Sequence, residues 1–271
     1  MPALWVAAAI VIMAAAAAIV WFRGAGSNHF PAFVKTPDQN VLLVTIDTLR
    51  ADALGSSGGR AATPNLDRLA GSGVRFTFAH AQSVVTLVSH TNILTGEYPF
   101  QHGVRDNAGF RLATGSTTLA TILHARGVPA AAFVGAFPLN RQFGLAQGFD
   151  VYDEVSARDS LAADFSLPER RAGEVVGLAT AWIAQQQKPW LAWVHVFDPH
   201  APYAPPPPFD AQYAADPYAG EVAYVDKALG LEPRMFYENA LAGALCDDAT
   251  KERLAEIGAG HAWGSVAAEA R

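Results

Sequence analysis

The stretch Asn40-Val-Leu-Leu-Val-Thr-Ile-Asp47-Thr-Leu-Arg-Ala-Asp52 decides the fold class of this 271-residue chain. Its run from Val41 to Ile46 is largely apolar, rich in β-branched residues and bounded by polar ones, as a buried parallel strand would be. The run ends on a carboxylate, Asp47, and ligands of open α/β sheets bind beyond the carboxyl ends of the strands. Asp47 is therefore placed for chemistry. A helix N-cap after a strand is an equally good interpretation of this segment alone.

Strand and helix patterns alternate along the rest of the chain. Strands are expected at 74–81, at 130–134 and in the apolar run from Trp190, and helices at 64–70, 117–126 and 171–187. A further segment, 83–96, reads as a loop that runs into a short helix closed by Gly96. This alternation predicts a parallel sheet covered by helices on both faces.

Two further groups of polar residues follow extended segments. Thr86 opens the short helix, where free backbone N–H groups favour an anion, although by itself it is better explained as a helix N-cap. His195, Asp198 and His200 follow or end the Trp190 strand. An imidazole there suits acid or base chemistry near neutral pH, while the alternative is a polar loop with incidental histidines.

Seven short motifs occur in an order that is specific as a set. They are Asp47-Thr-Leu-Arg-Ala-Asp52, Thr63-Pro-Asn-Leu-Asp-Arg-Leu-Ala70, Thr86-Leu-Val-Ser-His90, Leu94-Thr-Gly-Glu-Tyr-Pro99, His102-Gly-Val104, His195-Val-Phe-Asp-Pro-His-Ala-Pro-Tyr203 and Tyr218-Ala-Gly-Glu-Val-Ala-Tyr-Val-Asp226. From about residue 40 to about 230, the chain resembles the N-terminal part of the sulfatase branch of the alkaline-phosphatase superfamily.

This resemblance implies an alkaline-phosphatase-like α/β/α sandwich and a metal-dependent hydrolase or transferase of phosphate or sulfate esters. The substrate would be a small molecule, a lipid or a glycan, and the metal zinc, manganese, magnesium or calcium. Thr86 takes the family's nucleophile position, Asp47 and Thr86 would be metal ligands, and His200 would bind the substrate or protonate the leaving group. His90, Asn107 and His195 are expected substrate contacts, although each could be an ordinary polar residue.

The nucleophile position departs from the family pattern. Sulfatases carry Cys or Ser in a Cys/Ser-x-Pro-Ser-Arg motif and oxidise that residue to formylglycine, whereas this chain has Thr86, Val88 and His90. Threonine cannot form this aldehyde. The resemblance therefore shifts toward relatives with a threonine nucleophile, such as phosphodiesterases, phosphonate hydrolases and phosphoglycerol transferases. Thr48 beside Asp47 points the same way, and a phosphothreonine intermediate would split the reaction into two steps.

The resemblance stops after Gly230. The family continues to a strand that ends in Asp-His-Gly and supplies metal ligands, but no Asp-His-Gly occurs in this chain. Residues 40–230 are thus expected to form an incomplete, apparently truncated domain, and 231–271 a divergent helical tail. Two protein ligands rarely hold a metal firmly, which predicts weak metal binding. The alternative function is a non-catalytic truncated remnant without a complete metal site.

The N-terminal segment predicts a membrane location. Residues 3–22 contain no charged residue and no proline, and a helix of this length spans roughly 30 Å. We expect a transmembrane anchor at 1–23 and a linker at 24–39, with a cleaved signal peptide or a buried helix as alternatives. The domain is expected outside the cytoplasm by family resemblance, although Arg23 and the positive-inside rule favour the cytoplasm.

Charge and motif content argue against other classes of function. The net charge is −6 and no Lys- or Arg-rich run is present, so nucleic acid is not an expected partner. The glycine-containing stretch at 55–59 lacks the Gly-Lys-Ser/Thr ending of a phosphate-binding loop. Cys246 is the single cysteine, which rules out an internal disulfide.

Overall fold

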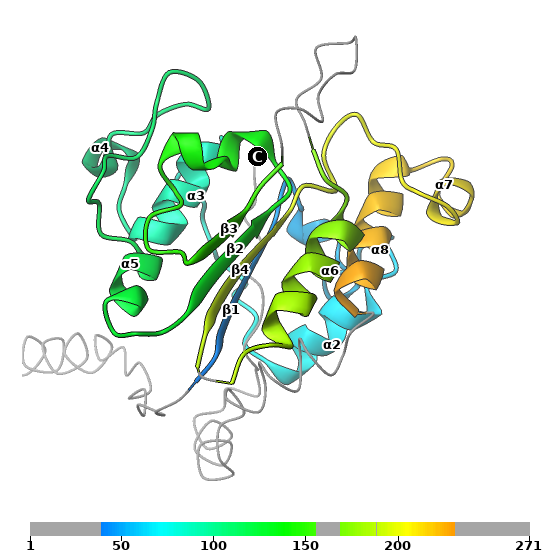
Figure 1. Cartoon of the computed structure of the whole chain (residues 1–271). Coiled ribbons are helices and arrows are strands. Elements are labelled where there is room, and N and C mark those ends of the chain that lie inside the picture. Colours follow the sequence, from blue (N-terminus) through cyan, green and yellow to red (C-terminus); the bar gives the residue numbers. More distant parts are fainter. Residues whose placement is uncertain (1–38, 156–168, 188, 231–271) are drawn as a thin grey trace, which may run out of the picture. The chain divides into compact units, whose positions relative to one another are not determined.

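Four parallel strands form the sheet of the computed structural model, which describes residues 39–155, 169–187 and 189–230 (Figure 1). The spatial order is β1-β4-β2-β3. The strands are β1 (Val41–Ile46), β2 (Ala130–Val134), β3 (Val151–Asp153) and β4 (Leu191–Val196). Three of them match the predicted strands closely, and β3 was not predicted.

The register brings the ends of β1 and β4 together. Thr45 pairs with His195 and Ile46 with Val196, and His195 also lies opposite Val134 of β2. All six residues of β4 are buried, because this strand is central and covered on both faces. The chain segments that leave β1 and β4 therefore begin side by side at one edge of the sheet, where parallel sheets bind ligands.

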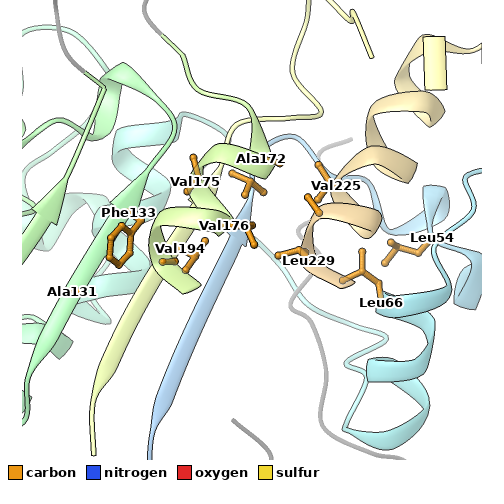
Figure 2. Close-up of a cluster of buried hydrophobic side chains, with 13 residues drawn as sticks. Leu54, Leu66, Ala131, Phe133, Ala172, Val175, Val176, Val194, Val225 and Leu229 are labelled. Carbon is orange, nitrogen blue, oxygen red and sulfur yellow. The ribbon is translucent and has the colours of Figure 1, made fainter. Parts of the chain in front are cut away.

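One face of the sheet packs against three helices, α6 (Ala172–Ile183), α8 (Pro217–Gly230) and α2 (Pro64–Ser72). Figure 2 shows α6 over the strands, with α8 beyond it and then α2. Apolar side chains fill this layer and alternate with those of the other face, as the period of a strand requires. They include Phe133, Val194, Val175, Val176, Val225, Leu229 and Leu66.

The opposite face carries α3 (Thr86–Thr95) and a second apolar cluster. Trp193 is fully buried there, beside Val134 of β2 and Leu87 of α3. The short helix α5 (Leu119–His124) begins after Thr118, whose hydroxyl accepts the N–H of Thr121. Helices on both faces confirm the predicted sandwich of a parallel sheet between two helical layers.

The remaining elements are short. They are α4 (Pro99–His102), α7 (Phe209–Gln212) and the 3₁₀ turns η1 (Ala51–Ala53), η2 (Gly55–Ser57), η3 (Phe137–Leu139) and η4 (Arg141–Phe143). The strand predicted at 74–81 is wrong. Its alternating Phe76 and Phe78 are 53% and 85% exposed and line no core, so this segment gains no buried face that would hold it in a sheet.

The membrane prediction also needs correction. In residues 39–155, 169–187 and 189–230, no helix combines the length and apolarity needed to cross a membrane. The predicted anchor needs about 20 residues, whereas α8, at 14 residues, is the longest helix described. For the described residues, this finding contradicts the predicted membrane-anchored location. Residues 1–23, nearly all of the linker 24–39 and the tail 231–271 lie outside the described residues.

Candidate active site

Asp47 and Thr86 lie together at the carboxyl edge of the sheet. The backbone N–H of Asp47 donates to the carbonyl oxygen of Val196 at 3.0 Å, which extends the β1–β4 pairing by one residue. The side chain of Asp47 is only 11% exposed. Thr86 is the first residue of α3, and its Oγ1 donates a hydrogen bond of 3.3 Å to Asp47 Oδ2. The structure thus brings the two predicted metal ligands into contact.

Asn107 closes the N-terminus of α3. The N-cap residue of this helix, Val85, has no polar side chain, and the Oδ1 atom of Asn107 instead accepts the N–H of Leu87 at 2.8 Å. A helix N-terminus exposes N–H groups that need such partners. Since the carbonyl end of the amide is engaged in this way, the NH₂ end of Asn107 is the end that can donate to an anion beside Thr86.

Two imidazoles lie behind this pair in the interior. His195 of β4 is fully buried and His90 of α3 is 5% exposed, and their ring centroids are 4.6 Å apart in an edge-to-face arrangement. Both were expected to contact the substrate. Because neither ring reaches the surface, their places in the fold suit support of Asp47 and Thr86 better than contact with a ligand.

Hydrogen bonds fix the proton position of the His90 ring and allow the ring proton of His195 to lie on Nε2. His90 Nδ1 lies 2.7 Å from the carbonyl oxygen of Thr86, which can only accept, so Nδ1 carries a proton. Thr45 Oγ1 accepts from Trp193 Nε1 at 3.0 Å and lies 3.0 Å from His195 Nδ1. The Thr45 hydroxyl proton can then go to His195 Nδ1, which leaves the ring proton on Nε2, facing Asp47.

Burial keeps these histidines uncharged near neutral pH. It is the main cause that lowers the pKa of His195 well below the ordinary value, with smaller contributions from His90 and His200. Burial also lowers the pKa of His90, against the opposing effect of Asp47. His195 Nε2 is 3.8 Å from Asp47 Oδ2, too far for a hydrogen bond, and has no such partner in the described ranges.

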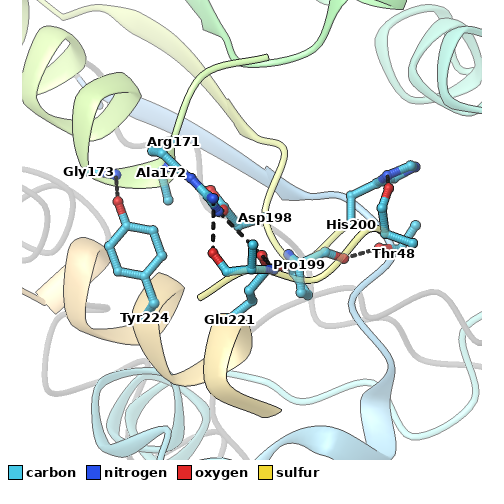
Figure 3. A network of polar contacts seen from close by, with 11 residues as sticks. Thr48, Arg171, Ala172, Gly173, Asp198, Pro199, His200, Glu221 and Tyr224 are labelled. Carbon is cyan, nitrogen blue, oxygen red and sulfur yellow. Dashed lines mark hydrogen bonds and ion pairs between the residues drawn. The ribbon is translucent and has the colours of Figure 1, made fainter. Parts of the chain in front are cut away.

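His200 lies in the loop that follows β4. Its ring stacks on Phe197 at 4.3 Å between centroids, and its Nδ1 donates to the carbonyl oxygen of Ala201 at 2.8 Å. In Figure 3 it lies near Thr48, whose hydroxyl donates to the carbonyl oxygen of Pro199. Thr48 has a φ of 46°, unusual for a β-branched residue, and such strain is common at functional sites.

Asp198 belongs to the same motif as His200 but points elsewhere. It is 5% exposed, and Figure 3 shows its carboxylate directed toward the start of α6. There it accepts hydrogen bonds of 2.7 Å from Arg171 Nη1 and from the N–H of Ala172. Sequence reasoning gave no role to Arg171, because nothing in its local pattern indicates a partner 27 residues away.

The metal-ligand set is incomplete among the residues described. Asp47 and Thr86 offer two oxygen donors, but this part of the chain contains no group of three or more His, Cys, Asp or Glu residues that could hold a metal ion. The donors present do not fit a divalent ion by themselves, since such ions need four or more ligands.

Comparisons with known proteins agree with this architecture. The Sulfatase family model matches residues 39–231. An N-acetylgalactosamine-6-O-sulfatase of Bacteroides thetaiotaomicron is 37% identical over 81 residues, which cover 30% of this chain and 15% of that protein. The phosphonate monoester hydrolase of Agrobacterium radiobacter has a similar structure, with a TM-score of 0.59 and 20% identity over 82% of this chain and 60% of that one.

A protein of the alkaline-phosphatase superfamily from Vibrio parahaemolyticus is also similar in structure. Its TM-score is 0.58 and its identity 24%, over 79% of this chain and 53% of that one. The chain therefore belongs to the sulfatase family, with the α/β fold of the alkaline-phosphatase-like sulfatases. This confirms the family predicted from the ordered motifs. The match spans only 15% of the length of the Bacteroides sulfatase.

Proposed function

We propose that this sulfatase-family chain hydrolyses, or transfers, sulfate or phosphate esters with Thr86 as the nucleophile. The observation that supports the proposal most directly is the hydrogen bond between Thr86 and Asp47 at the N-terminus of α3. A hydroxyl in this position has a neighbouring carboxylate to receive its proton, and the helix N-terminus favours the anionic group that it attacks.

The reaction runs in two steps. The Thr86 oxygen bonds to phosphorus or sulfur, its proton passes to Asp47, and the bond to the leaving oxygen breaks. His200 Nδ1 is engaged by the carbonyl oxygen of Ala201, so Nε2 is the atom that can give a proton to the leaving oxygen. Water then attacks the ester on Thr86 and gives its proton to His200 Nε2. As the bond to the Thr86 oxygen breaks, Asp47 returns its proton to that oxygen, and the threonine hydroxyl is regenerated.

The chemistry of the nucleophile favours phosphate over sulfate. A threonine cannot be converted to the formylglycine of typical sulfatases, so Thr86 would have to attack directly as an alkoxide or hydroxyl. We expect the alcohol of the ester to be a small molecule, a lipid or a glycan, and the Bacteroides relative is named for a sulfated sugar. Asn107, through its NH₂ end, is the substrate contact that the geometry supports best.

Members of the sulfatase family generally depend on a metal ion. We propose that Asp47 and Thr86 would be two of its ligands in this chain, although they do not form a complete site by themselves. A divalent ion there would neutralise charge on the transferred group. Because the described residues contain no group of three or more His, Cys, Asp or Glu residues around such an ion, we expect weak binding, and every step above is assigned to side chains of the chain itself.

Matched aryl esters test this function. The full chain is incubated with p-nitrophenyl sulfate, p-nitrophenyl phosphate and bis-p-nitrophenyl phosphate, quenched in acid, and the Thr86 peptide is analysed by mass spectrometry. We expect turnover of at least one phosphate ester and a phosphorylated Thr86. Turnover with a modification on another residue, or no turnover of any ester, would contradict the proposal.

One observation favours a second candidate, a non-catalytic member that keeps the fold and an anion pocket. It is the absence of a three-ligand metal group within the described ranges. Such a protein would bind inorganic phosphate or sulfate near Asn107 without releasing nitrophenol from any of the esters. Calorimetric titration with phosphate and sulfate tests this candidate. Binding without turnover would support a non-catalytic binding protein, and no binding would show that the anion site was assigned wrongly.

A further inference from the structure

The loop that carries His200 is held by charged side chains on α6 and α8. We propose that Arg171 and Glu221 are positioning residues that fix this loop, defined as 197–204, and with it the proton-transfer geometry of His200. The inference rests on the proposed function, because His200 receives its role there. Neither Arg171 nor Glu221 contacts the imidazole in Figure 3.

Arg171 forms hydrogen bonds with the loop on both sides of His200. It occupies the N-cap position of α6, and its Nη1 donates to Asp198 Oδ1 at 2.7 Å. Its Nη2 donates to the carbonyl oxygen of Ala204 at 2.9 Å. A guanidinium has a rigid fork of donors, so one side chain can fix the spacing of two acceptors that flank the histidine.

Glu221 holds the same loop from α8. It is 1% exposed, and its Oε1 accepts from the N–H of Ala204 at 2.8 Å and from Arg171 Nη1 at 3.3 Å. Its other oxygen, Oε2, is buried without a hydrogen-bond partner in the described part of the chain. A buried ion pair is often no more stable than apolar residues that replace both partners, so stability alone does not explain a carboxylate with an unpaired oxygen at this position.

Asp198 completes the network with both of its carboxylate oxygens. One oxygen accepts from Arg171 and the other from the N–H of Ala172, at the start of α6. The helix dipole favours a negative charge at this point. Two buried carboxylates thus share one guanidinium, and the loss of that guanidinium would leave both without their cation.

The loop that follows β1 is also held by α8, about one helical turn before Glu221. Tyr218 of α8 donates from its hydroxyl to the carbonyl oxygen of Thr48 at 3.0 Å and accepts the N–H of Arg50 at 2.8 Å. Thr48 in turn donates to Pro199, as Figure 3 shows. The face of α8 that bears Tyr218 and Glu221 therefore holds the loops after β1 and β4 in a fixed relation.

His200 itself makes few contacts that could set its position. Among the described residues, its ring contact is the stacking on Phe197 and its hydrogen bond is to the adjacent residue Ala201, both within the same loop. Its place relative to Asp47 therefore depends on where the loop is anchored. Misplacement of a catalytic group by even 1 Å lowers rates strongly.

The test compares Arg171→Lys and Glu221→Gln with the parent chain. Lysine keeps the charge but cannot reach Asp198 and Ala204 with a fixed fork, and glutamine keeps an acceptor for Ala204. Arg141→Lys is the matched control, because Arg141 also makes several hydrogen bonds, to Glu154 and to the carbonyl oxygen of Tyr152, but none to this loop.

The first measurement is amide hydrogen exchange in the full chain. We expect the Ala204 N–H to exchange about tenfold faster in Arg171→Lys, while the amides of β4 are unchanged and Arg141→Lys behaves like the parent. Exchange of Ala204 at the parent rate in Arg171→Lys would overturn the anchoring role. This measurement requires no activity.

The second measurement uses leaving groups that differ in their need for a proton. p-Nitrophenolate leaves unaided, whereas phenolate needs an acid, so His200→Ala should lower kcat/KM about a hundredfold for phenyl phosphate and far less for p-nitrophenyl phosphate. Arg171→Lys should show the same selectivity at about a tenfold loss, and should add nothing selective in the His200→Ala background. Equal losses for both esters would overturn positioning.

An inactive parent chain would be a failure of the proposed function, and the catalytic part of the inference would fall with it. The exchange of Ala204 would then decide by itself whether Arg171 anchors the loop. The two failures are distinguishable, because one is measured by turnover in the parent and the other by exchange in Arg171→Lys.

Discussion

Thr86 and Asp47, 39 residues apart in the sequence, are joined by a hydrogen bond of 3.3 Å from Oγ1 to Oδ2. The bond connects the start of α3 to the end of β1, so the two elements present one polar site at the sheet edge. Behind it, the chain Trp193–Thr45–His195 orders polar groups inside the sheet. The nucleophile and its proton acceptor are therefore held by secondary structure, which suits a preorganised site.

Replacement of the proposed nucleophile should abolish turnover without unfolding the chain. Thr86→Ala removes the attacking oxygen, and we expect kcat for a phosphate ester to fall by at least about a thousandfold. Thr86→Ser keeps the hydroxyl and its bond to Asp47 and should retain part of the activity. Thr95→Ala in the same helix is the control, because it also loses a hydroxyl bond, to the carbonyl oxygen of Thr91. Parent-like activity of Thr86→Ala would exclude this nucleophile.

Two substitutions of Asn107 should distinguish its capping of α3 from its binding of the anion. Asn107→Asp keeps an acceptor for the N–H of Leu87 but replaces the NH₂ donor by negative charge, so KM should rise by about tenfold or more while stability is kept. Asn107→Ala should lose about 1 kcal/mol of stability as well, because the helix cap is gone. Urea unfolding and steady-state kinetics measure the two effects. An unchanged KM in Asn107→Asp would remove this residue from the substrate site.

Tyr152 should make the chain sensitive to alkali. Burial, reinforced by Glu154 and opposed by Arg141, raises the pKa of Tyr152 far above its ordinary value of 10. The folded state then keeps the proton that the unfolded chain releases above about pH 10. The contribution of this group to the free energy of unfolding is therefore fully present below pH 10 and is lost as the pH rises. At pH 11 this group alone should lower the free energy of unfolding by roughly 1 kcal/mol.

Tyr152→Phe isolates that contribution. The variant loses the hydrogen bond from the tyrosine hydroxyl to the carbonyl oxygen of Leu139, at 2.6 Å, and should be about 1–2 kcal/mol less stable at pH 8. Its stability should then fall less than that of the parent between pH 9 and pH 11. Identical slopes in urea unfolding across this range would show that Tyr152 is not the titrating group.

The sequence was sufficient for three of the four strands and for the proximity of Asp47 and Thr86. Apolar runs predicted β1, β2 and β4, and a parallel sheet necessarily gathers their carboxyl ends. The order β1-β4-β2-β3 could not be read in this way, because it depends on contacts between distant segments. His195 was therefore expected at a substrate, whereas a central strand encloses it completely.

Other differences between the predictions and the structure can also be explained from particular residues. Phe76 and Phe78 alternate as in a strand, but periodicity does not reveal whether a covering layer exists, and both side chains are exposed. The hydrogen bonds from Arg171 to Asp198 and Ala204 could not be predicted from the sequence, because α6 and the His200 loop meet only in the folded chain. Asn107 was predicted to contact the anion, but its capping of α3 was not.

The last prediction concerns the metal. Among the described residues, the candidate site brings Asp47 and Thr86 together as oxygen donors without a group of three or more His, Cys, Asp or Glu residues, and a threonine hydroxyl is a poor ligand until it loses its proton. We therefore expect calorimetric titration of the chelator-treated chain with zinc, manganese, magnesium and calcium to give dissociation constants no tighter than about 0.1 mM. Asp47→Asn, which removes the charge and preserves the shape, should weaken this binding further. Tight one-to-one binding that Asp47→Asn abolishes would mean that residues beyond the described ranges complete the site. In that case the non-catalytic alternative would have to be abandoned.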